Sequence, residues 1–100
     1  MRRSLVALLL VAAAACAGPE NRVDGVVVDV DGDLAGVSAF EIVTADGSRL
    51  RFVPGEGVDA FAGGAPLSHL SEHLQTGSPV RVTYVEEDGV LIALVVTDAP

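Results

Sequence analysis

The stretch Pro66–Gly77, with the sequence PLSHLSEHLQTG, is the one segment after residue 22 whose pattern is typical of a helix. Proline suits the first position of a helix, where its missing N–H is not needed, and Gly77 suits the position just after the last turn. Three leucines recur at i, i+3 and i+7, which predicts one apolar stripe facing a core; they are Leu67, Leu70 and Leu74.

Every other periodic segment of this region alternates like a β-strand, which favours an all-β fold. Three strands precede the helix and two follow it, and their predicted ranges are Val23–Asp31, Gly36–Ala45, Arg49–Val53, Pro79–Glu86 and Val90–Thr97. The last strand is apolar at almost every position, so we expect it to be central in the sheet or buried on both faces. A chain of 100 residues holds one domain at most, here expected over Val23–Asp98. A closed barrel would suit this size because closure leaves no free sheet edge.

Alternation within the strands predicts which side chains face a core. On the first strand Val26, Val28 and Val30 share one face, and Gly25 indicates a bend or a bulge. On the other strands the expected inward residues are Phe40, Ile42, Leu50, Phe52, Val80, Val82 and Tyr84. The longest irregular piece is glycine-rich and carries Phe61, which we expect to close one end of the core; it spans Pro54–Ala65.

The first residues are typical of an export signal. Met1-Arg2-Arg3 precedes an apolar run from Leu5 to Ala15, which is the layout of a signal peptide. The run Leu5–Ala17 has 13 residues, fewer than the roughly 20 that a membrane-spanning helix needs. We therefore expect residues 1–15 to be removed and the chain to be exported.

Cys16 is the only cysteine, so no internal disulfide can form. The residues Ala13-Ala14-Ala15-Cys16 resemble the lipobox of bacterial lipoproteins. The resemblance implies cleavage before Cys16 and lipidation of its thiol, which would anchor the chain on the extracytoplasmic side of a bacterial cell envelope. Residues 16–22 would then be the lipidated cysteine and a polar tether. The alternative is a cut after Ala17 and ordinary secretion.

Loss of the signal makes the chain more acidic. The whole chain has a formal net charge of −8, and the signal takes two arginines and no acid with it, which leaves −10. Such a surface repels phosphate backbones and anionic lipid head groups, so no nucleic-acid partner is expected. It favours basic proteins or small cations, and acidic surfaces also serve solubility alone.

The order of three strands, a helix and two strands resembles the OB-fold, a small Greek-key barrel. The stretch Leu74–Val82, LQTGSPVRV, resembles the L-x-x-G-x-x-V-x-V phrase of small exported bacterial OB domains, and is similar to the periplasmic bacterial-OB-fold family. The likeness implies a five-stranded barrel with its one helix between the third and fourth strands. It also implies a binding groove across strands two and three, whose outer side would carry Glu41, Arg49, Arg51 and Val53. OB-folds serve unrelated functions, so the likeness implies no activity.

The segment His69-Leu70-Ser71-Glu72-His73 fits the pattern H-x-x-E-H of inverted zinc proteases. Histidines four residues apart on a helix can share a metal ion, and Glu72 could then act as a base. A catalytic zinc site needs a third protein ligand, and the sequence shows none. The leucines of the helix are expected in the core, which would leave His69 and His73 on its flanks. The alternative is two surface histidines near a helix end.

Two further patterns, one of aspartates and one of serines, contain residue types that could bind a metal or act in catalysis. The acids Asp29, Asp31 and Asp33 alternate as in a calcium loop, but leucine and phenylalanine stand at the sixth and twelfth positions, so the EF-hand pattern fails. A solvated hairpin turn is the alternative. Ser68 and Ser71 lie near the histidines without a nucleophile elbow around them, which does not favour nucleophilic catalysis.

Together these patterns favour a non-enzymatic binding domain that is monomeric and holds no cofactor. Its expected partners are a membrane, through Cys16, and an envelope protein or a small cationic ligand at the outer strands. The alternative is a metal-binding module in which His69, Glu72 and His73, with nearby acids, hold zinc; a calcium site at the aspartates is the weaker metal hypothesis.

Overall fold

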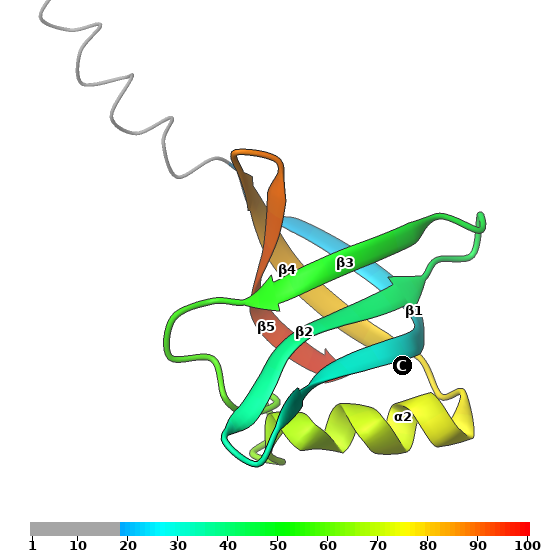
Figure 1. Cartoon of the computed structure of the whole chain (residues 1–100). Helices are drawn as coiled ribbons and strands as arrows, with labels where there is room; N and C mark the ends of the chain where they lie inside the picture. Colours follow the sequence, from blue (N-terminus) through cyan, green and yellow to red (C-terminus); the bar gives the residue numbers. More distant parts are fainter. Residues whose placement is uncertain (1–18) are drawn as a thin grey trace, which may run out of the picture.

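The computed structural model describes residues 19–100, and its elements follow the predicted order (Figure 1). The strands are β1 (Asn21–Asp33), β2 (Gly36–Val43), β3 (Arg49–Pro54), β4 (Val80–Glu87) and β5 (Val90–Asp98). A 3₁₀ turn, η1 (Leu67–His69), runs directly into the helix α2 (Leu70–Thr76) between β3 and β4. The predicted signal segment and Cys16 lie outside the described residues. Within residues 19–100, no helix has both the length and the apolarity that crossing a membrane requires.

The five strands close into a barrel in the order β1-β2-β3-β5-β4, with β4 paired back onto β1. All neighbours are antiparallel except β3 and β5, which are parallel. The loop after β3 continues along β5: Gly55 N–H donates to the Ala93 carbonyl at 2.8 Å. Further on, Ala62 N–H donates to the Val96 carbonyl at 2.9 Å. The prediction of an all-β, OB-like Greek-key barrel with one helix between the third and fourth strands is confirmed.

Strand β1 is shared between two partners, and this decides which of its side chains face the core. It pairs first with β4, as far as Gly25, and then with β2. A Cβ on Gly25 would lie 2.8 Å from a carbonyl oxygen of β2, so glycine permits the close approach at this change of partner. Val27 is buried in step with Gly25 and leaves Val26 exposed, and the register shift between Val27 and Asp29 then lets Val30 pack against the core. Because this bulge interrupts the alternation, Val26, Val28 and Val30 do not share one face of the strand, and that prediction is wrong.

The barrel core contains the inward residues predicted for β2, β3 and β4. Phe40 and Phe52 are fully buried with ring centroids 5.4 Å apart, and Tyr84 meets Phe52 edge-on at 5.1 Å. The last strand is central, as one alternative predicted, because β5 pairs with β3 and with β4, but the other alternative, burial on both faces, is wrong. On β5, Val90 and Val95 are exposed because the outer side of this strand faces solvent at those positions.

The helix closes one end of the barrel, with a different set of residues from the one predicted (Figure 1). Leu67, Leu70 and the predicted plug Phe61 are buried. Leu74 is 41% exposed, and His73 is buried in its place. A 3₁₀ turn has three residues per turn, so Leu67 and Leu70 lie directly above one another and the buried stripe continues at i+3. The prediction that Leu74 faces the core and that His73 lies on a flank of the helix is therefore wrong, and so is the alternative that both histidines lie on the surface.

Candidate functional site

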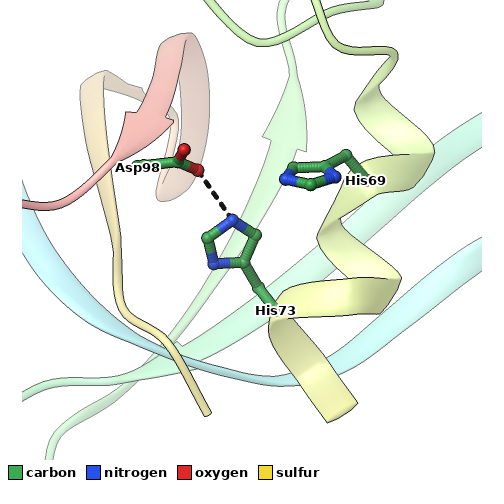
Figure 2. A group of neighbouring side chains, drawn as sticks. All are labelled: His69, His73 and Asp98. Carbon is green, nitrogen blue, oxygen red and sulfur yellow. Dashed lines mark hydrogen bonds and ion pairs between the residues drawn. The ribbon is translucent and has the colours of Figure 1, made fainter. Parts of the chain in front are cut away.

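Three side chains with metal-ligating groups converge beside the helix (Figure 2). In the part of the chain that the structure describes, they are the one such group, and their ligand atoms all lie within 4.8 Å of one another. They are His69, His73 and Asp98. Two of them belong to the predicted H-x-x-E-H segment, and the third comes from a distant strand.

The two histidines meet because of their spacing on the helix. His69 ends η1 and His73 lies one turn later in α2, so the side chains project from neighbouring turns. Their ring centroids are 5.0 Å apart with planes at 84°. Asp98 is the last residue of β5, and the β4–β5 hairpin pairs it with Val80 at the start of β4, just after the helix.

Both ring nitrogens of His73 face acceptors. Nδ1 donates to the carbonyl of Ser78 at 2.8 Å, and Nε2 lies 2.7 Å from Oδ1 of Asp98. A carbonyl and a carboxylate only accept hydrogen bonds, so each nitrogen of His73 faces a group to which it donates whenever it carries hydrogen. When a metal ion replaces one hydrogen, the Ser78 carbonyl selects the tautomer that leaves Nε2 as the ligand.

His69 is oriented in the same way. Its Nδ1 lies 3.3 Å from Oε2 of Glu72, three residues further along the helix. The ring nitrogen left for a metal is therefore Nε2, and Figure 2 shows a ring nitrogen of His69 directed toward the pair formed by His73 and Asp98. A hydrogen bond from the far ring nitrogen to a carboxylate or a backbone carbonyl is the usual support of a metal-binding histidine. Glu72, the third residue of the predicted zinc group, thus lies beside the outer nitrogen of His69 and does not belong to the group of convergent ligand atoms.

Phe61 packs against both imidazoles. Its ring is stacked on that of His73, with centroids 5.6 Å apart and planes at 18°, and meets the ring of His69 edge-on at 5.0 Å. Phe61 comes from the long loop after β3, and the N–H next to it in sequence, at Ala62, is tied to β5. The loop therefore restricts the rotation of the two ligand rings.

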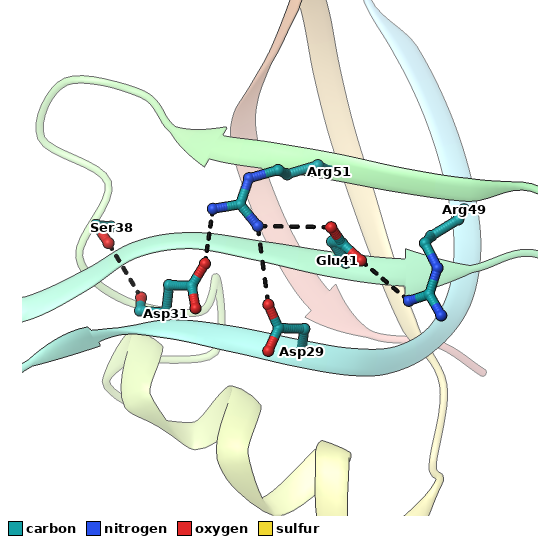
Figure 3. Close-up of polar contacts among 6 residues, drawn as sticks. All are labelled: Asp29, Asp31, Ser38, Glu41, Arg49 and Arg51. Atoms are coloured by element: carbon teal, nitrogen blue, oxygen red, sulfur yellow. Dashed lines mark hydrogen bonds and ion pairs between the residues drawn. The ribbon is translucent and has the colours of Figure 1, made fainter.

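The predicted interaction face lies on the outer side of β2 and β3, where its charges are paired (Figure 3). Nη1 of Arg49 donates to Glu41 at 3.0 Å. Arg51 contacts Asp31 at 2.6 Å, Glu41 at 3.5 Å and Asp29 at 3.8 Å. Its hydrogen bond to Asp31 raises the pKa of the Arg51 guanidinium.

The other residues that the sequence singled out lie away from the histidine group. Two of the calcium candidates face Arg51, and the third, Asp33, accepts a hydrogen bond from the N–H of Ala35 at 2.8 Å within the turn. Val53 is exposed beside the arginines of β3. Ser68 and Ser71 line another pocket, of about 620 Å³, next to the β1–β2 turn.

Asp98 is the site residue that the sequence did not indicate. It stands 25 positions after His73, at the end of an apolar strand, and no local pattern distinguishes it from the other thirteen acids. Only the register of β4 with β5 brings it to the histidines. Comparison with protein-family models and with curated proteins finds no match to this chain.

Proposed function

We propose that the chain is a non-enzymatic domain, anchored outside a membrane through Cys16, that binds a divalent transition-metal ion at His69, His73 and Asp98. The observation that carries the proposal is the orientation of the imidazoles. Each has its Nδ1 beside an acceptor, Glu72 for one and the Ser78 carbonyl for the other, so both leave Nε2 for a metal next to a carboxylate.

The donor set selects the class of metal. Two imidazoles and one carboxylate suit zinc, copper, nickel and iron, whereas calcium and magnesium take oxygen ligands. Donors around tetrahedral zinc, with bonds of about 2.0–2.1 Å, lie about 3.3 Å apart. The 2.7 Å contact between His73 and Asp98 must therefore open by about 0.6 Å. The Asp98 side chain is 69% exposed and is free to make this movement.

Calorimetric titration of zinc into the full chain tests the site, with Cys16→Ser in every protein so that the thiol cannot compete. We expect one zinc per chain, and at least a tenfold loss of affinity in Asp98→Asn and His69→Gln. Asp88→Asn is the matched control, since it makes the same change in the β4–β5 turn at the other end of the barrel, and it should bind as the parent does. Equal affinity in Asp98→Asn and the parent would refute the site.

The location outside a membrane rests on the signal-like residues and on Cys16. Intact-mass spectrometry of the chain from a bacterial membrane fraction tests it. We expect a mature chain that begins at Cys16 and carries the mass of its acyl groups. An unacylated chain that begins at Gly18 would contradict the anchor and leave the metal site untouched.

A second candidate function is recognition of a basic or mixed-charge partner at the outer face of β2 and β3. It is favoured by the exposed side chain of Val53, which lies beside the ion pairs of Arg49, Arg51 and Glu41. Protein interfaces commonly have such an apolar centre with a polar rim. Replacing both arginines, in Arg49→Glu/Arg51→Glu, should remove a partner that is captured from membranes by the parent chain. An unchanged set of captured proteins would count against this face.

A further inference from the structure

A metal ion at the proposed site would have three protein ligands, and the polar groups around them are already engaged. Glu72 contacts Nδ1 of His69, the ring nitrogen that points away from the ligand position. The carbonyl of Ser78 accepts from His73 at 2.8 Å, and the hydroxyl of Thr76 accepts the Ser78 N–H at 3.2 Å. Within residues 19–100, the group of convergent ligand atoms has no fourth member.

The two sides of this group differ in access. On the inner side, the buried ring of Phe61 covers both imidazoles. On the outer side, His69, His73 and Asp98 line a pocket of about 380 Å³. The rest of its wall consists of Glu72, Thr76, Ser78, Pro79 and Ala99. A fourth donor can therefore reach the ion only from this pocket.

The charge of the centre selects the donor. Two neutral imidazoles and one carboxylate around a divalent ion leave a local charge of +1, which favours a neutral or anionic donor. Closed structural sites have four protein ligands, whereas sites with three keep a position for an external ligand. Given the metal site proposed above, we propose that the ion takes an imidazole or carboxylate donor from outside the chain at a coordination position facing this pocket.

Cobalt(II) provides the test, because its visible absorption depends on the number and kind of its donors. The full chain with Cys16→Ser is loaded with Co²⁺ and titrated with imidazole and, separately, with acetate, while dialysis measures the Co²⁺ that stays bound. We expect a saturable spectral change with Co²⁺ retained. A spectrum that stays constant while Co²⁺ remains bound would overturn the open position and leave the metal site standing. Absence of Co²⁺ binding would overturn both proposals.

A variant that fills the pocket serves as the matched control. Ala99→Phe places a ring in the pocket without changing a ligand, so it should hold Co²⁺ as the parent does and bind imidazole at least tenfold more weakly. If Ala99→Phe does not fold, Ala99→Leu fills part of the same pocket with a smaller side chain. An unchanged imidazole response in a folded, pocket-filled variant would contradict access by this route.

Gel filtration of the Co²⁺-loaded chain identifies the source of the donor. A monomer in the absence of imidazole indicates that a small molecule supplies the fourth ligand. A dimer that imidazole dissociates indicates that a side chain of a second copy supplies it. Both results support an open position, whereas a dimer that resists imidazole and shows no spectral response contradicts it.

Discussion

Replacing one leucine of the helix by alanine should unfold the barrel far more readily than replacing its neighbour. Leu70 is 0% exposed and packs into the core that closes the barrel end, whereas Leu74, four residues later, is 41% exposed. Leu70→Ala and Leu74→Ala remove the same atoms from the same helix, so their helix propensities cancel. The difference in stability between them measures burial alone.

The expected magnitudes follow from that burial. A buried leucine replaced by alanine costs about 2–5 kcal/mol, since the lost transfer energy is joined by a cavity. We expect about 3 kcal/mol for Leu70→Ala, and each kcal/mol lowers the Tm of a domain of this size by about 4–8 °C, a total of about 12–24 °C. Leu74→Ala should cost less than about 1 kcal/mol. A domain of roughly 80 residues has about 4–12 kcal/mol in all, so Leu70→Ala is close to the limit of folding.

Urea denaturation followed by far-ultraviolet circular dichroism supplies the free energies of unfolding. The dependence of the free energy of unfolding on urea concentration should be the same in the two variants as in the parent. Equal slopes show that the same surface is exposed on unfolding. Equal losses in Leu70→Ala and Leu74→Ala would refute the placement of the helix on the barrel. A larger loss in Leu74→Ala would mean that the leucine stripe, and not His73, faces the core.

The other predictions concern the barrel wall, its charges and the metal site. Gly25→Ala should lose about 1–3 kcal/mol in the same urea assay because its Cβ would meet a β2 carbonyl oxygen at 2.8 Å, while Gly63→Ala, with open space around it, should change little. Hydrogen bonds from Arg81 hold the pKa of Asp24 below its ordinary 3.8. A lowered pKa stabilises the fold above the unfolded value of 3.8 and this contribution is lost as pH falls through the folded value, so Asp24→Asn should melt below the parent at pH 7 and the difference should shrink as pH falls below 3.8. Zinc at 100 times its Kd should add about 2.7 kcal/mol to the stability of the parent and raise its Tm by about 11–22 °C, with little effect on Asp98→Asn.

The fold was predictable because its signals are local. Phe40, Ile42 and Phe52 alternate with outward residues over a few positions, and the turn containing Gly47, with φ of 87°, follows from the Asp-Gly pair. The order of strands and helix then limits the topologies to a small barrel. The errors arose where local periodicity is interrupted, at the bulge before Asp29 and at the 3₁₀ turn before Leu70.

On the outer face of β2 and β3, too, the direction of the side chains was predictable from the sequence and their partners were not. Alternation along β3 predicts that Arg49 and Arg51 point away from the core. It does not show that Asp31 and Glu41 lie opposite them, because cross-strand neighbours are set by the pairing of separate segments. The predicted recognition face therefore contained Glu41 but not Asp31, and both acids reduce the charge that the arginines present to other molecules.

The sequence alone determined the strands, the single helix and the i, i+4 spacing of His69 and His73, since each depends only on residues close together in the chain. The tertiary structure decided which helical residue is buried and which carboxylate completes the site. Asp98 meets His73 across 25 positions because the β4–β5 hairpin returns the end of β5 to the start of β4, beside the helix. The turn fixes the pairing of this hairpin near Asp88 and Gly89, but the register shift between Thr83 and Tyr84 and the position of the helix on the barrel end depend on tertiary packing.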